Sequence, residues 1–456
     1  MEKKTIFITI NRAIIVRNIL LNSAFSDFAK KYRIVFITPQ KNHDELRQKF
    51  PEFEIETLFE RSLTPFRQWL EQLFISLHKS LIYNPTIQIR SEYGILARKP
   101  VRFKWLRNKI EKYIFGRFLS HAPIRNFFKK IDAAIFSTNK YDSLIAQYQP
   151  DLVFITAMGA DDEIAFLRNC KKQGVKSVGM AMSWDNLSKF GLREKTDYFM
   201  VWSQYMKEEA LHFQDYAAHQ LEIVGIPQFD EYRAEPIMTR EEFYTKFHLD
   251  PKKKTLFFGS EGPVCPDDPY IVSFLKEKII DGTLSGYQIL VRPHFSYPMD
   301  LSRFEPLKDE IVAIDTYFET SHFKDGTALS LSMIRNLIAE IRYCDVHVTS
   351  TSTLVLDILA GGKLPLLYNF DKEKNTPMKD SIKRLYKTLW FREIFKFDLQ
   401  NVAQDEKELL EKIKMVLQNP DHSLQKRNEL VTRFCYKVDG ESGKRLFDFV
   451  EKKISE

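Results

Sequence analysis

The stretch CDVHVTSTSTLVLDILAGGKLPLL, residues 344–367, indicates the fold class of this chain. An apolar run leads into four hydroxyl residues, then into an apolar pattern of helical period, a Gly-Gly turn and a second apolar run. Strand, helix and strand in this order form a βαβ unit with parallel strands. Strands that are apolar throughout are typical of a parallel sheet covered by helices on both faces. We therefore predict an α/β domain around this stretch.

The same alternation extends along the rest of the chain. Apolar runs separated by helical patterns predict strands at residues 5–10, 33–38, 152–156, 177–182 and 198–202, and again at 255–259, 288–291, 311–314, 346–349 and 364–368. Between the two sets, VGIPQFDEY (224–232) contains a glycine and a proline that interrupt regular structure. A chain of 456 residues also exceeds the size of most single cores. We predict two Rossmann-like domains facing a cleft, residues 1–228 and 229–456, with the last helix packing back on the first domain.

The composition is that of a folded protein, with 44% hydrophobic and 28% charged residues. The net charge of +7 fits anionic substrates, a membrane surface or nucleic acid and does not choose between them. Four separated cysteines, with no Cys/His cluster at metal-ligand spacing, indicate reduced thiols and no metal site. The first apolar stretch is short and broken by Asn11 and Arg12, so we expect a core strand there and not a signal peptide. No apolar run approaches the roughly 20 residues of a membrane span. We expect a cytoplasmic protein, with attachment to the inner face of the cytoplasmic membrane left open.

The four hydroxyl residues lie where the predicted strand ends and the helix begins. They are Ser350, Thr351, Ser352 and Thr353, and Asp357 follows one helical turn later. Free backbone N–H groups and the helix dipole favour an anion at such a position, so the turn can bind phosphate while Asp357 reaches a sugar hydroxyl. A plain helix N-cap is the alternative, because serine and threonine are preferred there anyway.

Two further strand ends in the same half carry polar or small residues. One strand is followed by Arg292 and His294, and another ends in Gly259, Ser260 and Glu261. Arginine suits bidentate phosphate contacts, histidine can donate a hydrogen bond to an oxyanion, and small residues let a ligand approach the backbone. Ligands of open α/β sheets bind outside the carboxyl ends of the strands. We therefore predict one donor crevice formed by these three strand ends.

Polar residues also follow strands of the first half. Asp161, Asp162 and Asp185 are candidate general bases, because a carboxylate facing the donor crevice can deprotonate an acceptor hydroxyl. The alternatives are a helix N-cap for Asp161 and loop-stabilising Asx turns for Asp185 or Asn186. The residues expected on the acceptor side are Asn11, Arg12, Trp184 and Asn186.

Residues 63–130 interrupt the α/β alternation, and a helical insertion is predicted there. Its second part combines interleaved aromatic residues and a single acid, Glu111, with many cations. These are Arg98, Lys99, Arg102, Lys104, Arg107, Lys109, Lys112, Arg117, Arg125, Lys129 and Lys130. A basic amphipathic helix with aromatic anchors can lie on an anionic membrane surface. The alternatives are a solvated face whose aromatic residues pack on the sheet, and nucleic-acid binding, for which the sequence has no motif.

Six short motifs occur in a fixed order. They are SWDNLSKFG (183–191), VWSQYMKEEA (201–210), VGIPQFD (224–230), VRPH (291–294), STSTLVLDILAGGKLPLL (350–367) and DGESGKRL (439–446). In this order they resemble bacterial surface-carbohydrate glycosyltransferases of the GT-B fold, and the related CDP-glycerol glycerophosphotransferases. The likeness runs from about residue 151 to the C-terminus and leaves out the insertion.

The resemblance implies a nucleotide-activated donor in the C-terminal half, an acceptor in the N-terminal half, and transfer that needs no metal. It matches Arg292 and His294 to a basic dyad near the donor phosphates, and Ser352 and Thr353 to a phosphate loop. Asp357 stands where many relatives of this fold have glutamate. No histidine base follows the first strand, so the resemblance does not assign the base.

The sequence thus predicts a glycosyltransferase that moves a sugar from a nucleotide-activated donor to a polysaccharide or lipid-linked glycan in cell-surface carbohydrate biosynthesis. The nucleotide-sugar is a substrate and no cofactor is required. An anionic membrane surface is a further expected partner, and nucleic acid is not. The alternatives are a CDP-glycerol-type polyol-phosphate transferase, a sugar-nucleotide 2-epimerase, and a non-catalytic protein that binds nucleotide-sugars or glycans.

Overall fold

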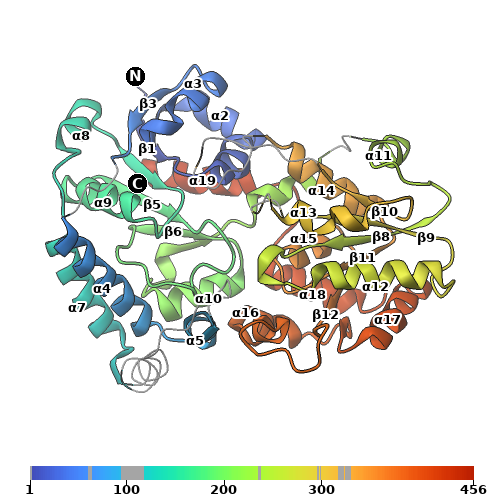
Figure 1. The fold of residues 1–456 in the computed structure, drawn as a ribbon. Helices are drawn as coiled ribbons and strands as arrows, with labels where there is room; N and C mark the ends of the chain where they lie inside the picture. Colours follow the sequence, from blue (N-terminus) through green and yellow to red (C-terminus); the bar gives the residue numbers. More distant parts are fainter. Residues whose placement is uncertain are drawn as a thin grey trace.

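The computed structural model describes residues 3–59, 64–93, 114, 118–234, 238–294, 297, 299–316, 323 and 330–456. Its strands form two separate sheets, one of seven strands and one of six. Helices cover the faces of both sheets, and the two halves form separate lobes that lie side by side (Figure 1). The predicted architecture of two Rossmann-like α/β domains is confirmed.

The first sheet is parallel throughout, in the order β3-β2-β1-β4-β5-β6-β7. Its strands are β1 (Thr5–Thr9), β2 (Arg33–Thr38), β3 (Glu54–Thr57), β4 (Leu152–Ile155), β5 (Lys176–Met180), β6 (Tyr198–Val201) and β7 (Leu221–Ile223). Every residue of β1 is buried, because this strand pairs with β2 and β4 and helices cover both of its faces.

The second sheet is also parallel, in the order β10-β9-β8-β11-β12-β13. Its strands are β8 (Lys254–Gly259), β9 (Tyr287–Arg292), β10 (Val312–Ile314), β11 (Val346–Thr349), β12 (Pro365–Tyr368) and β13 (Val402–Ala403). The strand order changes direction between β8 and β11, which are neighbours in the sheet but not in the sequence. In open α/β sheets such a reversal leaves a crevice at the carboxyl ends of the two strands.

Helices between the strands cover the sheets. In the first domain they are α1 (Ala13–Ile15), α2 (Ser23–Lys31), α3 (His43–Lys49), α8 (Asp142–Tyr148), α9 (Asp161–Lys172) and α10 (Gln204–Phe213). In the second domain they are α11 (Arg240–Lys246), α12 (Asp268–Ile280), α13 (Asp300–Phe304), α14 (Ser332–Tyr343), α15 (Leu354–Ala360), α16 (Leu389–Phe395), α17 (Glu406–Gln418) and α18 (Leu424–Cys435). The four cysteines are buried free thiols, as expected.

The last helix, α19 (Ser442–Ser455), lies in the first domain beside α2, so the chain crosses between the lobes twice (Figure 1). Asp230, in the linker, fixes its start by accepting hydrogen bonds from the backbone N–H groups of Ser442 (2.9 Å) and Gly443 (2.7 Å). Asn22 donates to the same carboxylate at 2.8 Å. The motifs VGIPQFD and DGESGKRL therefore meet in space, where they hold the two crossings together.

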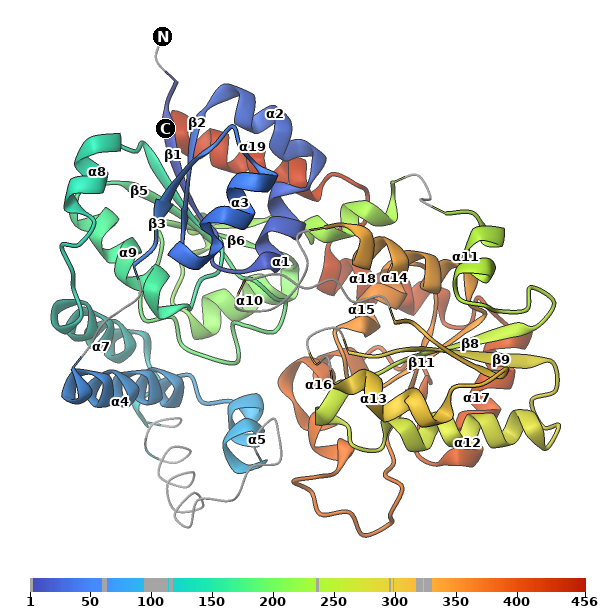
Figure 2. The ribbon, with the colours of Figure 1, turned by 45° about the horizontal axis from the view of Figure 1, so that its top comes forward.

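The insertion forms helices α4 (Pro65–Leu81), α5 (Pro85–Tyr93) and α7 (Ala122–Ile135). Figure 2 shows α4 and α7 side by side at the edge of the first lobe, and α5 next to the second domain. The Thr86 hydroxyl of α5 accepts a hydrogen bond from the backbone N–H of Leu389 in the second domain at 2.9 Å. The insertion thus adds a contact between the domains on the side away from the linker.

A buried ion-pair cluster holds α4 and α7 on the first domain. The guanidinium of Arg193 donates to both carboxylate oxygens of Asp132 in α7, each at 2.7 Å, and to Glu71 in α4 at 2.7 Å. The imidazole of His78 lies 3.0 Å from the same Asp132. The hydrogen bonds keep the pKa of Asp132 well below its usual range although burial alone would raise it.

The short strands β3, β7 and β13 were not predicted. They lie at or next to the edges of their sheets, and β3, with the sequence EIET, is exposed or half-buried throughout. An edge strand needs no continuous apolar run, so composition does not reveal it. In the described part of the chain, no helix is both long and apolar enough to span a bilayer.

Candidate functional site

A cavity lies between the two domains, at the carboxyl ends of strands from both sheets. Its wall combines side chains of the first domain, the linker and the second domain. The lining residues are Ile14, Arg17, Met182, Ser183, Trp184, Trp202, Ile226, Gln228, Phe229, Gly259, Ser260, Arg292, Pro293, His294, Met333, Ile334, Leu337, Ser352, Thr353, Leu354, Leu356 and Asp357. All three strand ends that the sequence predicted to converge in the second domain contribute to this wall.

The hydroxyl-rich turn after β11 faces the cavity in part. Ser352 and Thr353 line it, whereas Ser350 and Thr351 are buried and do not. Ser350 Oγ lies 3.5 Å from Cys265 Sγ, inside the domain. The hydroxyl oxygen of Ser352 accepts from the backbone N–H of Leu354 at 3.3 Å, so Ser352 also has the capping role named as the alternative.

The turn after β8 forms the adjacent wall and packs closely on the start of α15. A Cβ atom at Gly259 would overlap the terminal methyl group of Leu354, so that side chain would have to shift. Asp268, which the sequence did not single out, organises the turn. It accepts hydrogen bonds from Ser260 Oγ (2.7 Å) and from the backbone N–H of Glu261 (2.9 Å), and a further one from the Tyr368 hydroxyl. Burial raises the pKa of Asp268 to about 6.

Glu261, predicted on the donor side, is absent from the lining. Burial raises its pKa to about 8, and the charges of Lys189 and Asp185 across the interface also act on it. Glu261 therefore keeps its proton at neutral pH. In this state it can donate a hydrogen bond and does not repel a phosphate.

Arg292 lines the cavity, but its guanidinium is already engaged. It donates to Asp315 at 2.9 Å, to Glu340 at 2.8 Å and to the backbone carbonyl of Met333 at 3.2 Å. Burial raises the pKa of Glu340 well above its usual range. The Arg292 guanidinium is thus held by two acidic side chains of its own domain. Its predicted phosphate contact stays a prediction.

His294 lines the same wall, and a hydrogen bond holds its backbone in place. Its N–H donates to Asp300 Oδ2 at 2.7 Å, and its ring lies 4.9 Å from the ring of Tyr297, between centroids. Burial lowers the pKa of the imidazole to about 4. His294 is therefore neutral at pH 7, which suits hydrogen bonding to an oxyanion better than proton abstraction.

Asp357 is the one carboxylate among the described residues of the lining. Burial raises its pKa to about 6, and the hydroxyl of Tyr232 in the linker donates to its Oδ1 at 3.1 Å. The positive charges of Arg17 and Arg292 act in the opposite direction. Asp357 is thus an acceptor placed among two cations and a hydroxyl, where a sugar hydroxyl can bind.

Arg17 is a lining residue that the sequence reasoning missed. It lies in the π-helical turn Val16–Leu20, a rare form that occurs often at functional sites. Its Nε donates to Asn18 Oδ1 at 2.9 Å, and one Nη donates to Gln228 in the linker at 3.3 Å. Arg17 brings a cation from the first domain to the same cavity as Asp357. No motif around Arg17 in the sequence marks this position.

The loop after β5 contributes Ser183 and Trp184 to the wall. Asp185 in this loop accepts from Ser183 Oγ at 3.0 Å and forms an ion pair with Lys189. Asn186 Oδ1 accepts from the backbone N–H of Ser183 at 3.0 Å, which is the loop-stabilising role named as the alternative. Asp185 is therefore next to the cavity wall, and the local hydrogen bonds fix its position.

The other candidates of the first domain do not reach the cavity. Asp161 is the first residue of α9 and accepts from Arg193 at 2.9 Å, in the cluster that anchors the insertion. Asp162, Asn11 and Arg12 are also absent from the lining. Near Arg12, burial raises the pKa of Glu163 to about 7, while Thr9, Ala157 and the charge of Arg12 act in the opposite direction. Nothing in the sequence indicates this buried acid.

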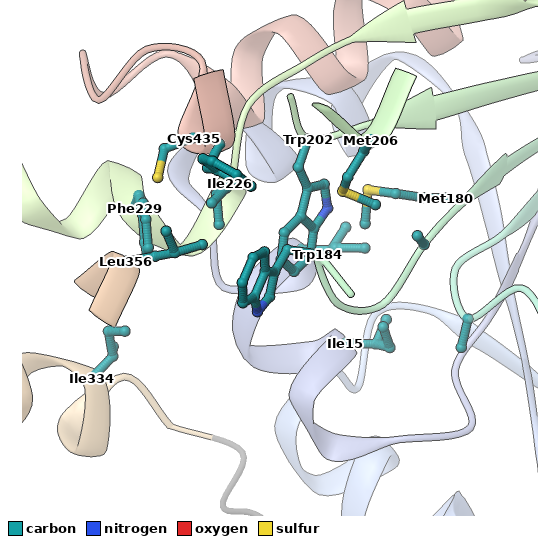
Figure 3. Close-up of a cluster of buried hydrophobic side chains, with 14 of the residues drawn as sticks. Ile15, Met180, Trp184, Trp202, Met206, Ile226, Phe229, Ile334, Leu356 and Cys435 are labelled. Atoms are coloured by element: carbon teal, nitrogen blue, oxygen red, sulfur yellow. The ribbon is translucent and has the colours of Figure 1, made fainter. Parts of the chain in front are cut away.

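Two tryptophans give the cavity an apolar wall with unused hydrogen-bond donors. Figure 3 shows the indoles of Trp184 and Trp202 between Met180 and Met206 on one side and Ile334 and Leu356 on the other. Both rings line the cavity and both are buried. Neither indole N–H has an acceptor among the described residues. Buried donors without a partner are costly, so they point to a polar ligand at this wall.

Two parallel Rossmann-like domains, a ligand cavity between them and a C-terminal helix that returns to the first domain define the GT-B fold. The solved structures agree. A putative UDP-N-acetylglucosamine 2-epimerase from Listeria monocytogenes matches with a TM-score of 0.54 at 10% identity, covering 99% of this chain and 97% of that one. The UDP-GlcNAc 2-epimerase of Methanocaldococcus jannaschii gives 0.51 at 10% identity, with 99% and 100% covered.

The S. aureus MnaA-UDP co-structure matches with a TM-score of 0.50 at 9% identity, covering 99% of this chain and 97% of that one. At identities this low the similarity establishes the fold. No protein-family model matches the sequence, and no curated protein matches it significantly.

Proposed function

We propose that this chain is a metal-independent glycosyltransferase that uses a nucleotide-sugar as donor and a polysaccharide or lipid-linked glycan as acceptor. One observation carries the proposal. The interdomain cavity at the strand ends holds Arg17 from one domain opposite Asp357 and the Ser352–Thr353 turn from the other, beside two indole N–H groups that no described residue accepts from. A ligand with a diphosphate and sugar hydroxyls satisfies each of these groups.

The donor phosphates would bind at Ser352, Thr353 and the neutral imidazole of His294, with Arg17 across the cavity. As the sugar leaves, negative charge develops on the diphosphate, and fixed donors and a cation stabilise it in a site that excludes water. Asp357 would accept a hydrogen bond from a ribose or sugar hydroxyl. The Trp184 and Trp202 indoles would contact the transferred sugar or the acceptor.

Asp185 is the candidate base that we retain. Of the three predicted bases, it belongs to a loop whose residues line the cavity, whereas Asp161 is bound to Arg193. Asp185→Asn should abolish transfer while nucleotide binding stays within about twofold of the unmodified chain. Asp161→Asn is the matched control and should retain transfer. If Asp185→Asn retains transfer and Asp161→Asn abolishes it, Asp185 is not the base.

The alternative reaction is 2-epimerisation of a nucleotide-sugar. Three structures of similar fold carry the name UDP-N-acetylglucosamine 2-epimerase, one of them as a putative enzyme. The two reactions differ in product. Incubation with UDP-, GDP- and CDP-activated donors should release free nucleotide slowly without an acceptor and faster with one. Conversion to the 2-epimer with solvent exchange of the C2 hydrogen would establish the epimerase instead. Binding with neither product would indicate a non-catalytic binding protein.

A thermal-shift screen against nucleoside diphosphates and CMP identifies the donor class first. A ligand that binds only the folded state raises its stability by mass action, so the preferred base gives the largest shift. We place the enzyme in the cytoplasm, where activated donors are made, at the inner face of the membrane that carries lipid-linked acceptors. Preference for CDP-glycerol in the same screen would favour the polyol-phosphate transferase.

A further inference from the structure

The insertion concentrates the exposed hydrophobic side chains of the molecule. Eleven large hydrophobic side chains are exposed among the described residues, and seven of them lie between residues 59 and 127. On α4, Phe66 is 68% exposed, Trp69 is 61% exposed and Leu73 is 49% exposed. Their spacing of three and four residues places them on one side of the helix, which we call the α4 face. The rings of Phe66 and Trp69 stack at 6.0 Å.

Among the described residues of α4 and α7, the exposed charged side chains are of one sign. The two acids of α4 and α7, Glu71 and Asp132, are buried and bound to Arg193. Arg67 and Lys130 are exposed cations on the same two helices. In the sequence, the stretch 98–117 between the two helices contains eight lysines or arginines and one acid. Two predicted cations do not belong to this set, since Arg125 and Lys129 bind Asp215 at 2.6 and 3.0 Å.

The α4 face is also rigidly placed. The Arg193 cluster fixes α4 and α7 on the first domain, and Phe74 of α4 packs on Phe136 with centroids 5.7 Å apart. In Figure 2 the pair of helices lies at the edge of the first lobe, away from the second domain. A contact made there would hold the whole first domain in one orientation.

From these observations we propose that the α4 face is the surface on which the protein binds an anionic lipid bilayer. Aromatic and aliphatic side chains enter the headgroup region, while neighbouring cations attract anionic lipids. A second copy of the chain would bring like charges together. Nucleic acid would leave the apolar stripe exposed, because phosphates contact cations and not Phe66 or Leu73. The bilayer is the partner that satisfies both features.

Vesicle flotation tests the proposal, with vesicles of phosphatidylglycerol and phosphatidylcholine in equal parts, low salt and no donor present. The unmodified chain should float with these vesicles, and should be released by high salt or by pure phosphatidylcholine vesicles. Phe66→Ser combined with Trp69→Ser should lower binding by about tenfold or more. Ile280→Ser combined with Met299→Ser is the matched control, because these side chains are as exposed but lie in the second domain. The control should bind like the unmodified chain.

Equal binding of the Phe66→Ser/Trp69→Ser chain and the unmodified chain would overturn the proposal. A second result would also overturn it: the unmodified chain forms an oligomer and binds no lipid, while the double variant is a monomer. The α4 face would then be an interface between copies of the chain. A second measurement works even if that variant folds poorly. Lipids with brominated chains should quench tryptophan fluorescence, and Trp69→Phe should reduce the quenching while it preserves binding. Because no donor is used, failure here leaves the proposed reaction untouched.

Discussion

The hydroxyl of Tyr232, in the linker, donates a hydrogen bond to Oδ1 of Asp357, in α15 of the second domain, over 3.1 Å. Both side chains are buried. Asp357 lines the ligand cavity, while Tyr232 belongs to the 3-10 turn Pro227–Tyr232 that carries the chain between the domains. A ligand that contacts Asp357 therefore contacts a side chain that is hydrogen-bonded to the linker.

Tyr232→Phe should lower the free energy of unfolding by about 1 to 3 kcal/mol, because the change leaves a buried carboxylate without its donor. Urea denaturation at neutral pH measures this loss. The control is a double-mutant cycle with Asp357→Ala. In the Asp357→Ala chain, Tyr232→Phe should lower the free energy of unfolding much less. Strictly additive effects would show that the hydrogen bond contributes nothing.

Gly259→Ala should disturb the cavity wall, because the added Cβ overlaps Leu354 at the start of α15. We expect a loss of about 1 to 3 kcal/mol in stability and weaker nucleotide binding, as for other overpacked positions. Leu354→Ala in the same chain makes room for the methyl group and should restore nucleotide affinity in part. If Gly259→Ala alone binds and unfolds like the unmodified chain, the close approach is not important.

The pH dependence of stability should show the effect of Glu209 in α10. Burial raises its pKa to about 8 from 4.5, so the folded chain keeps a proton that the unfolded chain loses between these values. The free energy of unfolding then falls as pH rises from about 4.5 to about 8. Glu209→Gln removes this pH-dependent loss. Across that pH range, the free energy of unfolding of the variant should rise by on the order of 2 kcal/mol relative to the unmodified chain.

Glu208 is the matched control for Glu209, with the opposite sign. The hydrogen bond from Arg433 lowers its pKa, so its contribution is present at neutral pH and is lost as pH falls through the folded value. Glu208→Gln should therefore lose a little stability at neutral pH and none in acid. Thermal unfolding of both variants at several pH values distinguishes them. Parallel pH curves for the Glu209→Gln chain and the unmodified chain would contradict the assignment.

Arg193→Met should destabilise the first domain strongly, because it removes the guanidinium that forms the 2.7 Å ion pairs with buried Glu71 and Asp132. A loss of about 3 to 5 kcal/mol is typical when one partner of a buried ion pair is removed. Arg433→Met removes an arginine from a half-exposed pair with Glu208 and should cost less than about 1 kcal/mol. Similar losses in calorimetric unfolding would mean that the Arg193 cluster does not anchor the insertion.

The two sheets could be predicted because their central strands are buried on both faces and therefore apolar throughout. The convergence of Arg292, His294 and the Ser352–Thr353 turn followed from strand order, since carboxyl ends of parallel strands share one edge. The partners of charged residues could not be predicted in this way. Arg193 binds Asp132 and Glu71, which are 61 and 122 residues away in the sequence, and nothing local marks such a pairing.

The same limit explains the two main revisions of the site. Asp161 has the sequence position of a candidate base, yet a distant arginine binds it away from the cavity. Arg17 has no motif around it in the sequence, yet the π-helical turn and its contact with Gln228 of the linker place it in the cavity wall. Both outcomes depend on tertiary contacts and not on local pattern.

The central claim is that the interdomain cavity binds the diphosphate of a nucleotide-activated donor. Isothermal titration calorimetry of the preferred nucleoside diphosphate with the unmodified chain, Arg17→Met and the surface control Arg67→Met tests it most directly. A charge-assisted hydrogen bond lost from the site should weaken binding by about tenfold to a hundredfold in Arg17→Met, while Arg67→Met binds like the unmodified chain. Equal affinity in all three chains would contradict the account.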